Sequence, residues 1–220
     1  LYSLINGLPH ALAERFYAPW PDMETMMRTN NLPLLSLETR HSLAEFDLVG
    51  FTLQYELSYT NILNMLDLGG IPLLAEERTV EHPFVIGGGP CAFNPEPLAM
   101  FFDLFVIGDG EEATVDLIDC YRKWQKGPHP KSREEFLMDA ASIQGIYVPA
   151  LYKVEYKADG TIGSFTPKDG RIPAKITKRI VKDLDGAYYP EKFVVPYVET
   201  IHDRIMLEVM RGCTRGCRFC

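Results

Sequence analysis

Three short apolar runs constrain the fold of this chain more than any other feature of its sequence. They have the length of β-strands and comprise residues 47–53, 82–86 and 104–107. Continuous apolar runs of this length indicate strands that are buried on both faces of a parallel sheet. Segments with the apolar spacing of helices follow them, at residues 58–68, 96–102 and 111–123. This alternation of strand, loop and helix predicts an α/β fold with a doubly wound parallel sheet.

Upstream of these runs the apolar pattern is less regular. Apolar residues at three- and four-residue spacing predict a helix at the start of the chain that ends near Gly7. Three methionines between residues 23 and 27 suggest a second helix. Short apolar stretches over residues 11–17 and 32–37 are interpreted as strands.

A different pattern begins after Gly127, where glycine and proline interrupt the helical spacing. The later elements are, in order, a short helix at residues 133–141, an alternating strand at 147–156, a return strand at 161–165, an extended connector at 170–200 and a last strand at 204–210. The pair Asp159-Gly160 is a strong hairpin signal, because both residue types are favoured in two-residue turns. We therefore predict a β-hairpin downstream of the parallel sheet.

Composition and charge exclude several classes of protein. Of the 220 residues, 46% are hydrophobic and 24% are charged, which is typical of a globular chain. No apolar run reaches the roughly 18 residues of a membrane-spanning helix, and the N-terminus lacks the features of a secretory signal. The net charge of −8 argues against nucleic-acid binding by the whole surface.

The charge is also uneven along the chain, with −12 over residues 1–170 and +4 over residues 171–220. Such a change of sign marks a domain boundary or a C-terminal part that meets an anion. The chain does not begin with Met, and its last residue is a cysteine within a motif. We therefore expect it to be a piece of a longer protein.

Cysteines are concentrated at the end of the chain. Three of the five, Cys213, Cys217 and Cys220, form a C-x3-C-x2-C motif. An odd number with this clustering indicates a metal or cluster site in a reducing, cytoplasmic compartment rather than a disulfide framework. Thiolates select zinc, copper(I) or iron–sulfur clusters. A structural zinc site needs a fourth ligand, whereas a cubane cluster on three cysteines keeps one iron open for a reaction.

The residues between the cysteines suit an anionic centre. Gly212 and Gly216 would let the backbone turn tightly and donate N–H groups to sulfur. Three positively charged side chains would favour the thiolate form of the cysteines. They are Arg211, Arg215 and Arg218.

The motif resembles that of the radical S-adenosylmethionine (radical SAM) superfamily, C-x3-C-x-Φ-C, in which the aromatic Φ is here Phe219. The resemblance implies a [4Fe–4S] cluster on Cys213, Cys217 and Cys220, with Phe219 near the adenine of S-adenosylmethionine. The fourth iron would bind the amino and carboxylate groups of this cofactor, whose one-electron cleavage gives a 5′-deoxyadenosyl radical. An electron donor such as flavodoxin or ferredoxin is implied too, while the substrate stays unknown. The alternative is a zinc knuckle that a later residue completes.

Three upstream segments read DLVGFT at residues 47–52, VIGGGP at 85–90 and VIGDGEE at 106–112. In this order they resemble the cobalamin-binding-like domain that precedes many radical SAM barrels. The resemblance implies cobalamin as a candidate cofactor in a crevice lined by Thr52, Gly87, Gly88, Gly89, Gly108 and Gly110. The cobalt-ligating signature D-x-H-x-x-G of that family is absent, because no histidine of the chain has this spacing. The alternative is that both glycine loops are tight strand-to-helix turns without a ligand.

These inferences give a chain of three parts. A Rossmann-like, cobalamin-binding-type domain spans residues 1–127, and we expect its first strand to be missing; a connector with a β-hairpin spans 128–203; and the first strand and cluster loop of a truncated (β/α) barrel span 204–220. We expect the full-length protein to be a radical SAM enzyme. This stretch alone should be inactive, because a complete barrel needs about 250 residues and would supply the catalytic residues. The alternatives are a module that binds cobalamin or substrate, and a scaffold without chemistry of its own.

Overall fold

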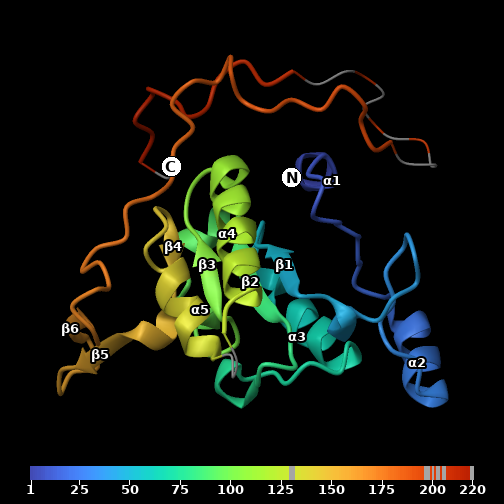
Figure 1. Ribbon diagram of the computed structural model, residues 1–220, viewed down its shortest axis with the longest axis horizontal. Helices are drawn as coiled ribbons and strands as arrows, with labels where there is room; N and C mark the ends of the chain where they lie inside the picture. Colours follow the sequence, from blue (N-terminus) through green and yellow to red (C-terminus); the bar gives the residue numbers. More distant parts are fainter. Residues whose placement is uncertain (129–131, 196–198, 200, 202–203, 205–206, 219–220) are drawn as a thin grey trace. The chain divides into compact units, whose positions relative to one another are not determined.

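The computed structural model describes residues 1–128, 132–195, 199, 201, 204 and 207–218 (Figure 1). The chain divides into two units, Leu1–Ile180 and Val181–Cys220. All the helices and strands found in the described residues belong to the first unit. None of these helices is both long enough and apolar enough to cross a membrane.

A four-stranded sheet forms the centre of the first unit. Its strands lie side by side in chain order, as β1 (Leu48–Thr52), β2 (Phe84–Gly88), β3 (Leu104–Val106) and β4 (Ile146–Tyr147). The first three strands are parallel, and β4 pairs antiparallel with β3. Val85, Leu104 and Phe105 are fully buried, so the apolar runs do form interior strands. The predicted α/β fold is confirmed, and the sheet is mostly parallel, with β4 as its antiparallel strand.

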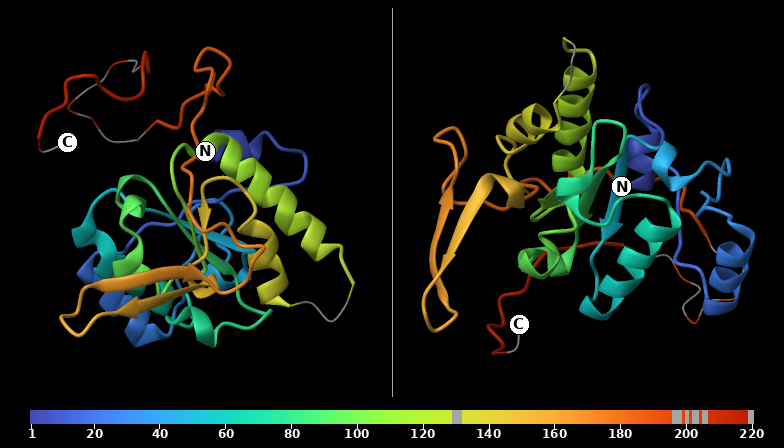
Figure 2. Two further views of the ribbon diagram at one scale, coloured as in Figure 1. Left: turned by 90° about the vertical axis from the view of Figure 1, so that its left-hand side faces the viewer. Right: turned by 90° about the horizontal axis from the view of Figure 1, so that it is seen from below.

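Helices cover both faces of this sheet (Figure 2). Helix α3 (Tyr59–Leu68) lies on one face, and α4 (Gly110–Gln125) and α5 (Arg133–Ala140) lie on the other. Each helix buries an apolar stripe, as its sequence spacing predicts. One side of the core is an aromatic cluster of Phe84, Tyr121, Trp124 and Phe136.

A separate β-hairpin follows the sheet. Its strands are β5 (Tyr152–Tyr156) and β6 (Ile162–Pro167), which pair antiparallel. At the turn, the Asp159 carboxylate accepts the backbone N–H of Thr161 at 2.9 Å, and Gly160 has a φ of +81°. The predicted hairpin is therefore confirmed. The domain boundary at residue 127 stays a prediction, although β4 joins the sheet from beyond it.

The N-terminal region contains helices but not the expected strands. Helices α1 (Tyr2–Asn6) and α2 (Pro21–Asn30) are present. The strands predicted over residues 11–17 and 32–37 are wrong, since the second region contains only an isolated bridge from Leu35 to Ser42 and the first contains none. A short apolar run becomes an interior strand only where a neighbour pairs with it and both faces are covered. Both regions leave large apolar side chains exposed instead.

Two further sequence predictions differ from the structure. The helix expected over residues 96–102 is reduced to a 3-10 turn at Glu96–Leu98, where Pro97 removes a helix donor. The described residues 204 and 207–210 do not form the strand expected over residues 204–210, and residues 205 and 206 lie outside the described residues. The remaining 3-10 helices are Leu43–Glu45, Glu56–Ser58, Ala75–Glu77, Pro90–Phe93 and Pro149–Leu151.

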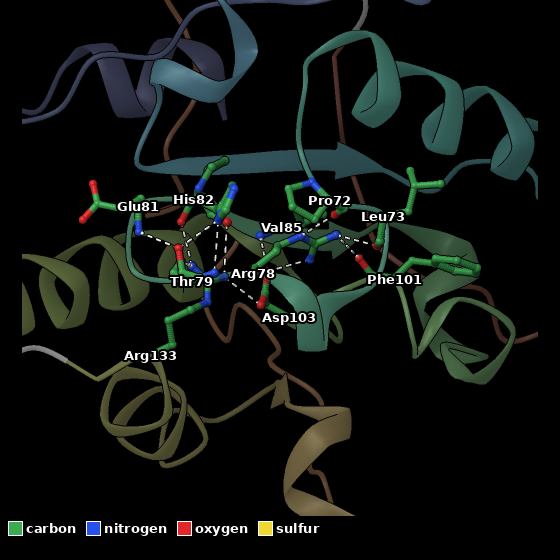
Figure 3. Close-up of polar contacts among 11 residues, drawn as sticks. Pro72, Leu73, Arg78, Thr79, Glu81, His82, Val85, Phe101, Asp103 and Arg133 are labelled. Carbon is green, nitrogen blue, oxygen red and sulfur yellow. Dashed lines mark hydrogen bonds and ion pairs between the residues drawn. The ribbon is translucent and has the colours of Figure 1, made fainter.

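A buried carboxylate, that of Asp103, joins the starts of β2 and β3 (Figure 3). Its Oδ2 atom accepts hydrogen bonds from Arg78 Nη1 at 2.9 Å and from the backbone N–H of Val85 at 2.7 Å. Its Oδ1 atom accepts one from Arg133 Nη2 at 2.8 Å. The Arg78 and Asp103 side chains are 0% and 2% exposed, so water does not screen the pair.

The two arginines also bind backbone carbonyls around this carboxylate. Arg78 donates to the carbonyl oxygens of Pro72, Leu73 and Phe101. Arg133 donates to those of Thr79, His82 and Pro83. Each guanidinium therefore fixes irregular backbone that the sheet itself does not hold. No described buried side chain has an unpaired nitrogen or oxygen atom.

We predict that Asp103→Ala lowers the free energy of unfolding by about 3–5 kcal/mol, because it leaves the buried Arg78 guanidinium without its counter-charge. The matched control is Asp67→Asn, which removes the exposed partner of Arg28 and should cost about 0–1 kcal/mol. Urea unfolding followed by circular dichroism measures both. Equal denaturation midpoints for the two variants would contradict the prediction.

Candidate functional site

The parallel strands bring most of the residues expected to line a crevice to one edge of the sheet. Thr52, the last residue of β1, lies beside Gly88, and Gly88 lies beside Val106 of β3. The Gly108 loop begins two residues after that strand. Open α/β sheets bind ligands at this carboxyl edge, at a point where the strand order reverses. The order of the four described strands has no such reversal.

The first glycine loop packs against the chain itself. A Cβ atom on Gly87 would lie 2.7 Å from the Phe105 ring, and one on Gly89 would lie 3.1 Å from the Leu53 carbonyl oxygen. Leu53 extends β1 by one residue, donating its N–H to Gly88 at 2.6 Å and accepting the N–H of Cys91 at 2.9 Å. Gly89 has a φ of +105°, which other residues rarely adopt. Close packing inside the sheet therefore accounts for Gly87 and Gly89.

The second glycine loop is held by a segment that lies far away in the sequence. Arg179 forms a parallel bridge with Gly108. The N–H of Arg179 donates to the Ile107 carbonyl at 2.9 Å, and the N–H of Asp109 donates to the Arg179 carbonyl at 2.9 Å. Gly108 has a φ of +105°, and a Cβ atom on it would overlap the Arg179 carbonyl oxygen. This glycine thus admits another part of the backbone.

We call residues 176–180 the Arg179 segment. The Arg179 side chain is 18% exposed, and its guanidinium forms ion pairs with Glu112 at 2.9 Å and Asp116 at 2.7 Å, both on α4. The neighbouring Lys178 carbonyl accepts a hydrogen bond from Gln144 Nε2 at 3.0 Å. No sequence pattern marks this segment, because it lies in the stretch that proline and glycine identify as a connector.

The other residues expected at this edge have neighbours in the chain or are open to solvent. Gly110 begins α4, and a Cβ atom on it would lie 3.4 Å from the Leu1 side chain. The Thr52 hydroxyl is exposed and accepts a hydrogen bond from Gln54 Nε2 at 2.8 Å. A Cβ atom on Gly88 would meet only Val106, at 3.8 Å. The arrangement favours the alternative of tight turns, and the residues at the Gly108 loop do not fit a bound cobalamin.

Cys91 follows the first glycine loop but lacks the features of a reactive thiol. Desolvation, with the neighbouring Glu56 carboxylate, raises the pKa of the Cys91 thiol above its ordinary value. The thiol therefore stays protonated at neutral pH, and protonated thiols are poor nucleophiles and poor metal ligands. Cys91 is therefore a partly buried side chain that packs beside the loop.

The cysteine motif belongs to the second unit. Cys213 and Cys217 are both exposed and form no disulfide. The Cys213 sulfur accepts the backbone N–H of Arg215 at 3.4 Å, and the flanking Gly212 and Gly216 have φ values of +85° and +64°. The tight turns expected at these glycines are therefore present. The described N–H that donates to the Cys213 sulfur is that of Arg215, which lies between the two glycines.

The donor set of this motif fits an iron–sulfur cluster. Two exposed thiols lie on a turning backbone with an amide directed at one sulfur, and amide hydrogen bonds to sulfur are a common feature of such centres. Cys220 and Phe219 lie outside the described residues. Among the described residues, no three thiol, imidazole or carboxylate side chains gather to hold a metal. The flanking Arg211 is paired with Glu208 at 2.9 Å.

Comparisons with known proteins place the sheet domain in a family context. The family model described as "Radical SAM proteins, N-terminal" matches residues 1–149, which include all four strands of the sheet. The uncharacterized protein MJ0966 of Methanocaldococcus jannaschii is 27% identical over 195 residues, or 88% of this chain. The chain spans 34% of the length of that relative. No solved structure matches the chain.

We predict that Gly108→Ala lowers the free energy of unfolding by more than ~1 kcal/mol, because the new methyl group meets the Arg179 backbone at an unfavourable φ. The matched control is Gly170→Ala, whose Cβ atom would meet nothing within 4 Å. That variant should be neutral or slightly stabilising. Denaturant titration of both variants measures the difference, and a control as unstable as Gly108→Ala would contradict this account of the loop.

Proposed function

The chain belongs to the family of N-terminal domains of radical SAM proteins, and from this premise we propose that Cys213, Cys217 and Cys220 hold a [4Fe–4S] cluster in the full-length protein. The full-length protein would then be a radical SAM enzyme. The observation that carries this proposal is the local geometry at Cys213 and Cys217. Both thiols are free and exposed, on a backbone that turns at two glycines.

When bound, such a cluster would supply an open iron for S-adenosylmethionine and the electron that cleaves it to a 5′-deoxyadenosyl radical. Residues of this chain would hold the cluster in place. The N–H of Arg215 donates to the Cys213 sulfur and so would help to hold that sulfur at the cluster. Arg215 and Arg218 add positive charge beside the thiols, and Phe219 would lie against the adenine. The electron would come from a donor such as flavodoxin or ferredoxin.

The sheet domain would act as a scaffold for this chemistry rather than as a second cofactor site. Both glycine loops at the carboxyl edge approach other parts of the chain closely. The loops that could have received a nucleotide-like tail are therefore used for packing. This observation favours a docking role for the domain over cobalamin or substrate binding.

We predict that the full-length protein takes up about four irons per chain after anaerobic reconstitution with iron and sulfide. Each of Cys213→Ala, Cys217→Ala and Cys220→Ala should lose most of this iron and the formation of 5′-deoxyadenosine. Cys91→Ala and Cys120→Ala are the matched controls, since Cys120 lies within α4 and Cys91 is a packed thiol. Metal analysis together with absorbance spectra measures the result. Zinc without iron in the wild-type protein would overturn the proposal.

A second prediction concerns cofactor affinity. Phe219→Ala should leave the iron content unchanged but raise the Kd for S-adenosylmethionine roughly 5- to 150-fold, which corresponds to the loss of about 1–3 kcal/mol of aromatic–base stacking. Phe193→Ala, in the same unit, serves as the control because its ring contacts Tyr189 instead. Equilibrium binding to the reconstituted full-length protein provides the measurement. An unchanged Kd would contradict the placement of Phe219 beside the adenine.

A further inference from the structure

We propose that the Arg179 segment is a permanent occupant of the sheet's ligand edge, so that this domain takes no cobalamin at the Gly108 loop. The proposal concerns the first unit and does not depend on the identity of the metal at the cysteines. It reverses the expectation that glycine at residue 108 allows a cofactor to approach the backbone. Here the approaching group is the backbone of Arg179.

Hydrogen bonds already occupy part of the backbone of the Gly108 loop. Ile107 donates its N–H to the Gly145 carbonyl at 2.7 Å and accepts the N–H of Arg179 at 2.9 Å. Asp109 donates its N–H to Arg179 in turn. The N–H groups of Ile107 and Asp109 and the carbonyl oxygen of Ile107 are therefore already paired at this loop. A ligand would have to break these bonds before it could make its own.

Arg179 fills the space beside the Gly108 loop. Arg179 lies between two glycines that both have positive φ values, Gly108 at +105° and Gly145 at +90°. A Cβ atom on Gly145 would lie 3.0 Å from the Arg179 Cβ atom. Both glycines are therefore fitted to this one residue. The local sequence is adapted to the close approach of Arg179 from both sides.

Ion pairs attach the Arg179 segment to α4. The Arg179 guanidinium forms ion pairs with both Glu112 and Asp116, one turn apart on α4. Lys178 contributes a further contact, because its ammonium lies 6.0 Å from the centre of the Phe93 ring, in the turn that follows the first glycine loop. The Arg179 segment thus connects both loops of the carboxyl edge.

The described histidines lie away from the carboxyl edge of the sheet. His82 precedes β2, at the opposite end of the strands, where its Nδ1 atom accepts the N–H of Thr79 at 3.1 Å. His10 lies 3.6 Å from Asp119, in the second half of α4, and the backbone N–H of His41 donates to the Ser36 hydroxyl. None of these three follows β1, β2 or β3 at the carboxyl edge, so none is placed to ligate cobalt there.

The test uses the full-length protein, incubated anaerobically with hydroxocobalamin and then desalted. Cobalamin absorbance should show only substoichiometric retention. Hydrogen exchange should show protected amides at Ile107, Asp109 and Arg179, unchanged by hydroxocobalamin. Retention of about one cobalamin per chain would overturn the proposal. Exchange of the Arg179 amide as fast as that of an unfolded peptide would overturn it too.

Two variants test whether the slow amide exchange depends on the ion pairs of Arg179 with Glu112 and Asp116. Arg179→Ala should speed exchange of the amides of residues 107, 109 and 179 at least roughly threefold. Arg171→Ala, which removes an exposed pair with Asp169, should leave exchange at these amides unchanged. Equal exchange in the two variants would overturn the role of Arg179.

Iron analysis of the same samples separates this inference from the proposed function. Bound cobalamin together with about four irons would overturn only the present inference. Zinc without iron and without cobalamin would overturn only the proposed function.

Discussion

The carboxylate of Asp103 is the constraint on which the sheet of this protein depends. It accepts hydrogen bonds from two arginines and from the backbone of Val85, and it is almost completely buried. A buried charge without partners would cost several kcal/mol, so the folded state requires Arg78 and Arg133 to be in place together. The two arginines belong to the segment before β2 and to α5. One carboxylate therefore joins β2, β3 and a helix at the amino edge.

At the carboxyl edge of the sheet, close backbone contacts hold the loops in place, in addition to charge. Leu53 packs against Gly89, and Arg179 packs against Gly108. Both glycines have a φ of +105°, the conformation that glycine-rich ligand loops also use. Glycine at such a position shows that something approaches the backbone closely, but it does not distinguish a cofactor from the chain itself. In this domain the approaching groups belong to the chain.

Local patterns in the sequence predicted the elements whose stability is local. The apolar runs before Gly87 and Gly108 formed strands, and Asp159-Gly160 formed the hairpin turn. Contacts between distant residues could not be predicted in this way. Arg179 meets Glu112 across 67 positions, and no periodicity links the two. The strand expected over residues 11–17 failed for the same reason, because its apolar residues gave no sign that a pairing neighbour was lacking. The cysteine spacing needs no distant partner to be recognised, so the motif was evident from sequence alone.

The ion pairs of Arg179 explain part of the uneven distribution of charge along the chain. The net charge changes from −12 over residues 1–170 to +4 over residues 171–220. This change of sign indicates either a domain boundary or a C-terminal part that meets an anion. Arg179 is among the first cations of the basic region, and it binds two carboxylates of the acidic region, Glu112 and Asp116. The change of sign therefore does not coincide with the end of the first unit, which continues to Ile180. Part of the positive charge serves to anchor the connector to α4, while the arginines at the cysteines stay beside the thiols. A cationic C-terminal region thus has two separate anionic partners, one within the domain and one proposed at the cluster.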